Sequence, residues 1–408
     1  MLAEFVVLLG FGALLPILPL YVAEQGIDVP LYGLITAAWA IAKLFSEPLF
    51  GYLADRSGLR KPLMLVGLVL LALFTVLPLV FTGAAALFVL RLLSGAAAGM
   101  YEPAARGMIV DATDEGERGE AFGLYTAFQM GGFLVGPVIG AFAAHLGGGF
   151  AFPFVLTGVM TIAAAAYLFM ALPSRLAAVS PVRVRAGEGP GPAAATAPAT
   201  TGELDESPAP LRALLNRPML AAVVMYFGIS LTFGVYEVIW TLYMLRLGAS
   251  LEWVGATFMF FGLGVLIASP FAGRIVDRFG PIRFVVLGSG MIAVSGVVYA
   301  VATEPGLPTA VVPFEAVAEA FVIPALFALV AQGTPRGRSS TAQGIFGASG
   351  TVALIIASLA TGVLWARDPS LPFWFFIIGV VVCLAGGLLI YGLRRERDVG
   401  LDRSLSGA

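Results

Sequence analysis

Long apolar segments separated by short polar turns make up most of the chain. An apolar stretch of about 20 residues can cross the hydrocarbon core of a bilayer as an α-helix. A longer polar stretch divides the twelve segments of this kind into two sets of six. They cover residues 2–23, 31–54, 62–82, 86–111, 119–144 and 150–172, then 218–244, 252–273, 282–302, 310–333, 340–364 and 372–394. The pattern predicts an all-α membrane protein with twelve transmembrane helices in two six-helix halves.

The polar turn after the second segment of each set is a repeat. Both turns carry glycine, aspartate, arginine and glycine at the same four offsets. Internal repeats of this kind are typical of transporters in which two related bundles enclose a substrate site. The first turn contains Gly51, Asp55, Arg56, Gly58, Arg60 and Lys61, and the second contains Gly273, Asp277, Arg278, Gly280 and Arg283.

Polar regions separate and follow the two bundles. Residues 173–217 are rich in Pro, Ala, Gly and Thr, so we expect a disordered linker between an N-terminal bundle (1–172) and a C-terminal bundle (218–394). Residues 395–408 form a short tail. Most Arg and Lys residues fall on the linker side of the bundles. The positive-inside rule therefore predicts a multi-pass protein of the plasma (inner) membrane with linker, tail and both termini in the cytoplasm.

Composition narrows the classes of function. The chain is 59% hydrophobic and only 12% charged, which requires a bilayer as its surroundings. A net charge of -2 without a basic patch gives no support for nucleic-acid binding. Cys383 is the only cysteine and His145 the only histidine, which excludes an internal disulfide, a cysteine-based metal cluster and a His-dependent catalytic triad. We expect a monomer with no metal and no cofactor.

The first repeated turn resembles the signature of the major facilitator superfamily. The matching positions are Gly51, Asp55, Arg56 and Gly58, followed by the basic pair Arg60 and Lys61, while Leu59 stands where a basic residue is usual. The resemblance implies a twelve-helix transporter that works by alternating access. It also implies that the first and fourth helices of each half line a central cavity.

Segment 119–144 resembles the glycine-rich signature of the drug/proton antiporters of that superfamily. A stripe of small residues along one helix face also serves simply to pack helices, and that alternative stays open. The resemblance implies that this helix packs against a helix of the second half and governs closure of the outer side. The signature positions are Gly123, Gly132, Gly136, Pro137 and Gly140, with Ala141 in place of the final glycine.

Glu102 is the most informative of the ionisable residues that fall inside predicted helices. Such residues cost about 3 kcal/mol or more at the bilayer centre and are functional candidates by default. Glu102 falls near the midplane, and desolvation favours the neutral form of a carboxyl group, so we expect it to be the leading proton carrier. The alternative is a structural carboxylate neutralised by Arg106, one turn later.

Three further glutamates fall on helices that the resemblance places around the cavity. Glu237 is a candidate for binding a cationic substrate or a proton. Glu315 and Glu319 are one turn apart, and two close carboxylates do not both ionise readily in a low dielectric. Glu319 is nearer the midplane, whereas Glu315 has the alternative of reaching the outer water.

Lys43, Glu47 and Arg91 are the other intramembrane charges. Lys43 and Glu47 are one turn apart, so we expect an ion pair within the helix, with either a structural role or a role in substrate binding or gating. Arg91 and Gly95 resemble the Arg-x-x-x-Gly pattern of the superfamily, which implies a part in proton transfer. The alternative for Arg91 is to bridge backbone carbonyls at a helix bend.

The cytoplasmic turns predict a latch. By resemblance, Asp55 meets the positive N-terminal end of helix 340–364 when the inner side closes, and Arg60 pairs with Asp111. We expect this latch to break when one half rocks against the other and the cavity opens to the cytoplasm.

These features favour a proton-driven exporter, an antiporter of small lipophilic or cationic compounds with the proton gradient as its energy source. An alternative within the same fold is an exporter or symporter of a sugar, lipid or metabolite. A membrane enzyme or a receptor without transport is a distant alternative, because no nucleophile and base are evident. The aromatic residues expected around the cavity are Tyr101, Tyr226, Phe233, Tyr236 and Trp240.

Overall fold

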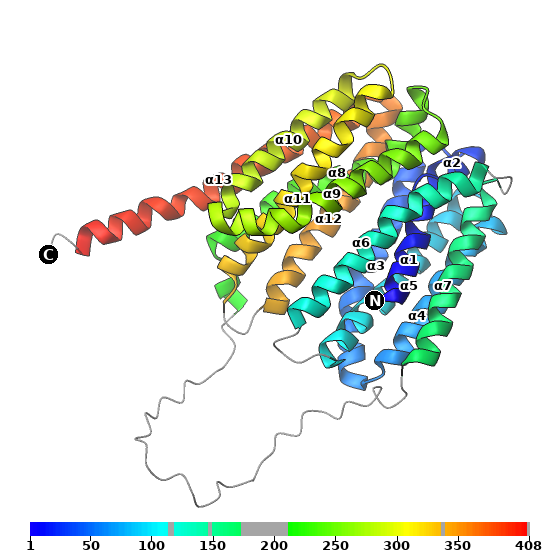
Figure 1. Ribbon diagram of the computed structural model, residues 1–408, viewed down its shortest axis with the longest axis horizontal. Helices are drawn as coiled ribbons and strands as arrows, with labels where there is room; N and C mark the ends of the chain where they lie inside the picture. Colours follow the sequence, from blue (N-terminus) through cyan, green and yellow to red (C-terminus); the bar gives the residue numbers. More distant parts are fainter. Residues whose placement is uncertain (113–117, 146–148, 173–210, 336–338, 406–408) are drawn as a thin grey trace, which may run out of the picture.

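A computed structural model describes residues 1–112, 118–145, 149–172, 211–335 and 339–405. Within these ranges the chain forms helices and short turns, with no strand (Figure 1). The first half contains α1 (Leu2–Leu14), α2 (Leu18–Glu24), α3 (Val29–Ser57), α4 (Arg60–Val76), the 3-10 turn η1 (Leu77–Leu79), α5 (Ala84–Ala112), α6 (Arg118–Ala143) and α7 (Ala151–Ala171). The second half contains the 3-10 turn η4 (Leu211–Leu214), α8 (Arg217–Arg246), α9 (Leu251–Phe279), α10 (Pro281–Val301), α11 (Gly306–Gly333), α12 (Ser339–Arg367) and α13 (Leu371–Leu405).

Every predicted segment coincides with one helix except two: the first is broken, and segment 62–82 contains α4 and the 3-10 turn η1. Within 2–23, α1 and α2 meet at an angle of 41°. Pro16 lies at the break, where its missing N–H and its ring interrupt the helical hydrogen bonds. Among the described residues, ten helices are long and apolar enough to cross a membrane, and the bent pair adds an eleventh. The apolar part of α6 is shorter, Ala127–Ala143. This arrangement is consistent with the predicted twelve-helix protein.

Both repeated turns end their helix in the same way. Gly58 follows α3 with a φ of 66°, and Gly280 follows α9 with a φ of 86°. These positive values suit glycine, which has no Cβ atom. The N–H of Gly58 donates to the carbonyl of Ala54 at 3.0 Å, and that of Gly280 to the carbonyl of Val276 at 2.9 Å. Helix termination therefore explains why the repeat carries a glycine at this offset.

The two halves pair their helices in the same pattern. In the first half α1 packs on α6 and α7, α5 packs on α3 and α4, and α4 packs on α7. The corresponding pairs of the second half are α8 with α12 and α13, α11 with α9 and α10, and α10 with α13. This equivalence is the spatial counterpart of the sequence repeat. Large apolar side chains cover the outside of both bundles, as expected against lipid, for example Phe45, Met170 and Leu389.

The glycine stripe of α6 receives α1, a helix of the same half. A Cβ atom at Gly132, Gly136 or Gly140 would collide with the α1 backbone, at the carbonyls of Phe5, Leu9 and Ala13 respectively. The stripe thus packs helices within the first half, as the alternative for a row of small residues anticipated, while the expected contact of this helix with the second half is also present. α6 does contact the second half, at α9, but through another face, where Leu134 and Ala141 meet Gly262 and Gly255. The glycine stripe thus holds the first bundle together, and Leu134 and Ala141 on another face of α6 meet the other half.

Contacts between the halves gather near one end of the molecule. α3 packs on α12 where Gly33 lies against the carbonyl of Ser358. At the same end His145 Nδ1 lies 2.7 Å from Glu252 Oε1 and joins the end of α6 to the start of α9. This end is opposite the repeated turns, because α3 and α9 begin there. On the predicted orientation it is the outer end.

Candidate functional site

A cavity of about 430 Å³ lies between the two halves. The first half contributes α1, α3 and α6, and the second half contributes α8, α9, α11 and α12. Its volume falls in the range of about 300–1,000 Å³ that is usual for small-molecule sites. Three carboxyl groups reach it, those of Glu237, Glu315 and Glu319. Its largest aromatic residues include Trp39, Tyr226, Phe233, Tyr236, Trp240 and Phe258.

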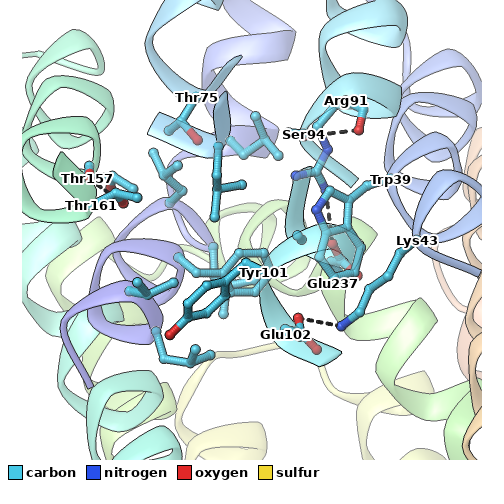
Figure 2. A pocket seen from close by; sticks show the side chains of 18 of the residues that line it. Trp39, Lys43, Thr75, Arg91, Ser94, Tyr101, Glu102, Thr157, Thr161 and Glu237 are labelled. Atoms are coloured by element: carbon cyan, nitrogen blue, oxygen red, sulfur yellow. Dashed lines mark hydrogen bonds and ion pairs between the residues drawn. The ribbon is translucent and has the colours of Figure 1, made fainter. Parts of the chain in front are cut away.

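A smaller pocket of about 240 Å³ adjoins this cavity on the side of the first half (Figure 2). The two spaces share Phe11, Leu15, Trp39, Lys43 and Glu237. Tyr101, predicted as a cavity residue, lines the smaller pocket together with Glu102. Most polar and charged groups of the first half therefore gather beside the aromatic cavity, and Lys43 lines both spaces.

Glu315 of α11 lies between two phenols. The hydroxyls of Tyr236 and Tyr299 each donate to one of its carboxylate oxygens, both at 2.6 Å. The side chain is only 3% exposed, so the alternative that Glu315 reaches the outer water is wrong. The rings of Tyr236 and Tyr299 pack edge-on against Trp240, with centroids 5.5 Å and 5.2 Å away. The aromatic wall thus positions the donors that satisfy Glu315.

Glu319 lies one turn further along α11 and differs from Glu315 in its partners. It is 7% exposed and lines the same cavity. Within the described residues no hydrogen bond or ion pair reaches its carboxyl group, and its nearest charged neighbour is Glu315. Tyr226, stacked on Phe346 at 4.0 Å between ring centroids, lies in the same part of the wall. Glu319 is a carboxyl group without a counter-ion, next to the space where a ligand would lie.

Arg91 and Glu237 form an ion pair between the halves. Arg91 Nη2 lies 3.2 Å from Glu237 Oε1, and the two side chains are 17% and 14% exposed. Arg91 thus binds a carboxylate of the second half, which the alternative of a carbonyl bridge did not anticipate. Its guanidinium also lies 6.0 Å from the ring centre of Trp39, and Lys43 Nζ lies 5.0 Å from the same ring (Figure 2). Trp39 therefore separates two cations at the boundary of the two spaces.

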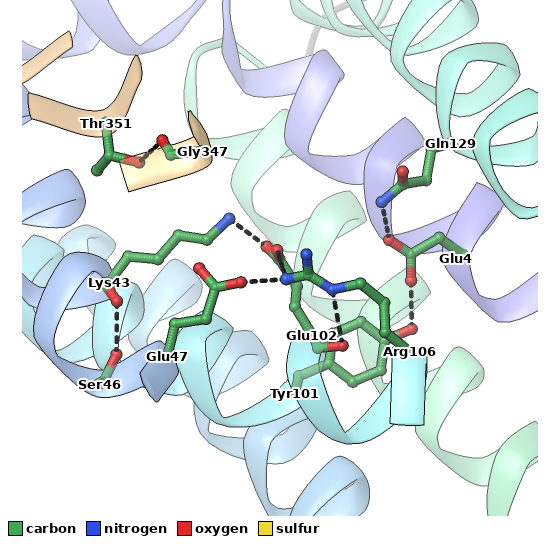
Figure 3. A network of polar contacts seen from close by, with 10 residues as sticks. All are labelled: Glu4, Lys43, Ser46, Glu47, Tyr101, Glu102, Arg106, Gln129, Gly347 and Thr351. Atoms are coloured by element: carbon green, nitrogen blue, oxygen red, sulfur yellow. Dashed lines mark hydrogen bonds and ion pairs between the residues drawn. The ribbon is translucent and has the colours of Figure 1, made fainter. Parts of the chain in front are cut away.

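The predicted ion pair between Lys43 and Glu47 is wrong, because each residue pairs with α5 instead (Figure 3). Lys43 Nζ lies 2.6 Å from Glu102 Oε1. Arg106 Nη2 bonds to Glu47 and lies 3.3 Å from Glu102 Oε2. The contact of Glu102 with Arg106 is the one that the structural alternative predicted. Two cations and two carboxylates thus form a network that ties α3 to α5.

Glu4 is a buried carboxyl group that the sequence reasoning missed. It is 1% exposed on α1. Tyr101 donates to Glu4 Oε2 at 2.5 Å, and Gln129 Nε2 donates to Glu4 Oε1 at 2.7 Å (Figure 3). The available signal was an acidic residue near the start of an otherwise apolar segment. Tyr299, the second donor to Glu315, was missed because a lone tyrosine in an apolar helix carries no pattern.

The repeated turns are only partly described. The side-chain surroundings of Asp55, Asp111, Gly123 and Asp277 lie outside the described residues, so the latch stays a prediction. Arg60 Nη1 donates to the carbonyl of Gly107 on α5. The remaining residues of the turns lie at the surface or at helix ends: Gly51, Arg56, Gly273, Arg278 and Arg283.

Lys61 has a structural partner in α7. Its Nζ donates to the carbonyl of Phe169 at 3.0 Å and to that of Leu172. Cations favour the negative C-terminal end of a helix, so Lys61 caps α7. Elsewhere, the described residues contain no group of three or more His, Cys, Asp or Glu side chains that could hold a metal ion.

Comparison with known proteins places the chain among membrane transporters. The family profile described as Major Facilitator Superfamily matches residues 1–314 and, in a second, overlapping match, residues 222–407. The quinolone resistance protein NorA of Staphylococcus aureus is 32% identical over 160 residues, which cover 39% of this chain and 40% of that protein. Multidrug resistance protein 2 of Bacillus subtilis is 31% identical over 161 residues, 40% of each chain. The chain thus matches about two fifths of the length of these curated relatives.

Solved structures share the architecture at low identity. A bacterial homologue of the human lysosomal transporter Spinster, in an inward-facing conformation, superposes with a TM-score of 0.74 at 13% identity over 95% of both chains. The nucleoside transporter NupG gives a TM-score of 0.73 at 13% identity, over 96% of this chain and 98% of that chain. At this identity the likeness concerns the fold alone.

Proposed function

This chain belongs to the major facilitator superfamily, and from that premise we propose that it exports small lipophilic or cationic compounds in exchange for protons. Membership of the family makes it a multi-pass membrane transporter. Its substrate class and its coupling to protons are the proposal. The names of the relatives in Staphylococcus aureus and Bacillus subtilis, which refer to quinolone and multidrug resistance, support the substrate class.

The observation that carries the proposal is Glu319 in the wall of an aromatic cavity. The cavity offers ring faces and apolar side chains over most of its surface, which suits lipophilic molecules of varied shape. A cation among these rings gains from their negative faces and from a carboxylate that has no other counter-ion. Few neutral polar groups line the cavity, chiefly Ser230, Thr257 and Thr351, which gives little support for a sugar as substrate.

Coupling follows from competition for this carboxyl group. A desolvated carboxyl group without a cation favours its neutral, protonated form. A cationic substrate instead favours the ionised form, so its arrival from the cytoplasm would release the proton. Protonation from the outside would then expel the substrate. Glu315, one turn away and also buried, strengthens the preference for one proton on the pair because two adjacent charges repel.

Glu102 is a weaker candidate for the proton carrier than Glu319. Two cations surround it, Lys43 at 2.6 Å and Arg106 at 3.3 Å, and both stabilise its ionised form. Glu237 likewise faces Arg91. We assign to these pairs a role in holding helices and halves together, and to α11 the binding of protons.

Alternating access is supported by the position of the contacts between halves. They gather at the predicted outer end, so the present conformation would open toward the cytoplasm. Export then requires the halves to rock about the cavity until the contacts move to the inner end. The Arg91–Glu237 pair would have to adjust in that movement, because its members belong to different halves.

The test is transport in liposomes that contain the purified protein. Ethidium, a lipophilic cation, and a radiolabelled sugar would be offered with and without a pH gradient. We expect gradient-driven accumulation of ethidium only. Glu319→Gln should lower it at least tenfold because the amide cannot titrate, whereas Glu24→Gln, which changes an exposed carboxyl group on α2, should not. Sugar accumulation, or gradient-driven ethidium transport by Glu319→Gln, would contradict the proposal.

A further inference from the structure

We propose that Glu4 is a second proton-binding site, located in the first half and separate from the carboxyl pair of α11. A role of Glu4 in the transport cycle rests on the proposed proton coupling. Proton binding by Glu4 does not depend on that coupling, so the two proposals can be tested separately.

The first argument is burial with neutral partners only. Glu4 is 1% exposed, more deeply buried than Glu315. Both of its oxygens accept hydrogen bonds, one from the phenol of Tyr101 and one from the amide of Gln129. Neither donor carries a charge. The hydrogen bonds satisfy the oxygens but leave a net charge uncompensated when the carboxyl group is ionised.

No cation forms an ion pair with Glu4 in the part of the chain that the structure describes. The charged group of α5 that acts on Glu4 is Glu102, which is acidic and bound to Lys43 and Arg106. Lys43 and Arg91 line the same pocket, but each is paired with another carboxylate, Glu102 and Glu237 respectively. α7, which packs on α1, contains no charged residue and contributes the hydroxyls of Thr157 and Thr161 to the same pocket. From α6 come Tyr125 and Gln129. A negative charge at Glu4 therefore has an acidic neighbour and no ion-pair partner among the described residues.

The second argument is an unsatisfied hydroxyl beside the carboxyl group. Tyr125 is 5% exposed and lies next to Glu4, and its buried hydroxyl makes no hydrogen bond of ordinary length in the described part of the chain. An orphaned buried hydroxyl is costly unless it finds a partner in another state. A phenol can accept as well as donate. When Glu4 takes a proton from cavity water, its new O–H can donate to Tyr125, which completes the hydrogen bonds of both groups.

The third argument is access. Glu4 lines the smaller pocket, which adjoins the aromatic cavity through Lys43 and Glu237. Water in that pocket can deliver a proton to Glu4 or remove it. Glu4 lies at the end of α1 that holds the repeated turns, whereas Glu315 and Glu319 lie on α11 in the other half. A proton bound at Glu4 is thus bound independently of the one on α11.

A second site changes the charge balance of export. One proton in exchange for one monovalent cation moves no net charge, so the membrane potential would not affect it. With a second proton on Glu4, each cycle carries one positive charge inward. The membrane potential would then drive export in addition to the pH gradient.

Infrared difference spectroscopy on the full chain in nanodiscs tests the site itself without any substrate. A pH titration of the wild type should show C=O bands from protonated buried carboxyl groups at neutral pH. Glu4→Gln should remove one component, and Glu319→Gln should remove a different one. Glu24→Gln is the matched control, since it removes an exposed carboxyl group of the same bent helix pair. A Glu4→Gln spectrum identical to that of the wild type would overturn the proposal.

Two conservative variants keep the test decisive if Glu4→Gln does not fold. Tyr101→Phe and Tyr125→Phe leave the carboxyl group in place but remove a hydrogen-bond partner, so the Glu4 component should shift in frequency. An unchanged band in both variants would overturn the proposal. A band that disappears on adding sodium at constant pH would assign a sodium site instead, and would also overturn it.

The transport arm uses tetraphenylphosphonium in proteoliposomes with a potassium diffusion potential and no pH gradient. Wild-type exchange should respond to the potential, and Glu4→Gln should lose that response. Exchange that is insensitive to potential in the wild type would overturn the coupled role of Glu4, even if ΔpH-driven export supported the proposed function. Absence of any export would refute the proposed function and leave the infrared result to decide on Glu4.

Discussion

In the first half, Glu47 and Glu102 lie against Arg106 and Lys43, whereas in the second half Glu315 and Glu319 lie among phenols and apolar rings. Glu47 lies on α3, whereas Glu102 lies on α5 and Glu315 and Glu319 lie on α11. The helices α5 and α11 occupy equivalent positions in the two bundles. The two halves therefore share one backbone arrangement but carry different charged and polar side chains on it. A carboxylate between cations is stabilised in its ionised form and joins helices. A carboxyl group among neutral groups is poised to change its protonation state.

The packing of the two halves differs as well. In the first half the close approach of α1 and α6 depends on glycines of α6. In the equivalent pair of the second half, a glycine of α8, Gly234, lies against Ala357 and Leu354 of α12. The same helix pair thus comes close in both halves, but the first half uses a row of three glycines on α6, whereas α12 has Ala357 and Leu354 at the contact with Gly234.

The largest effect is expected from Gly136→Leu. The side chain would meet the carbonyl of Leu9 and Gly12 Cα, where only backbone movement can make room. We expect a loss of more than the ~1–3 kcal/mol usual for overpacking, measured as a lower unfolding temperature in detergent. Gly131→Ala is the matched control, because its Cβ atom would meet only the edge of the Phe5 ring at 3.4 Å. Equal stability of Gly136→Leu and the wild type would contradict the packing of α1 in the groove.

The second prediction concerns a variant in which Glu319 gains a neighbouring cation, as Glu102 has in the first half. Tyr226→Lys would place a cation near Glu319 and give that carboxyl group the counter-ion it lacks. We expect gradient-driven export to fall at least tenfold, because an ion pair holds Glu319 ionised and competes with a cationic substrate. Tyr226→Met, which removes the ring without adding charge, should retain most of the coupling. Similar losses in both variants would mean that the ring, and not the missing cation, is what matters.

A third, smaller effect concerns the charged network of the first half. Lys43→Met leaves Glu102 with Arg106 alone, and the pair is about one fifth exposed, so we expect a destabilisation below the ~3–5 kcal/mol of a fully buried pair. Adding Glu102→Gln should recover part of the loss, whereas adding Glu47→Gln should not. Thermal unfolding of the single and double variants measures this. If Glu47→Gln instead recovered stability, the result would support an ion pair between Lys43 and Glu47 within α3.

The sequence predicted the helices well because apolar length is a local property. It also predicted the glycine turns at Gly58 and Gly280, where a positive φ imposes a residue type. It failed for Lys43, because the local partner one turn away lost to Glu102, which is 59 residues distant. The pairing of Arg91 with Glu237 spans 146 residues and joins two halves, and no local pattern encodes that. Glu4 was overlooked since its burial depends on Tyr101 and Gln129 of other helices.

The central claim is that the proton displaced by the substrate is bound at α11, while the charged network of Lys43, Glu47, Glu102 and Arg106 in the first half stays ionised. Proton release on substrate binding tests it most directly, with a pH indicator in weakly buffered detergent solution and tetraphenylphosphonium as the ligand. We expect the wild type and Glu102→Gln to release protons on binding, and Glu319→Gln to bind with a release reduced by about one proton per transporter. If Glu319→Gln released as many protons as the wild type and Glu102→Gln released none, the account would be contradicted. The proton carrier would then be Glu102 in the first half.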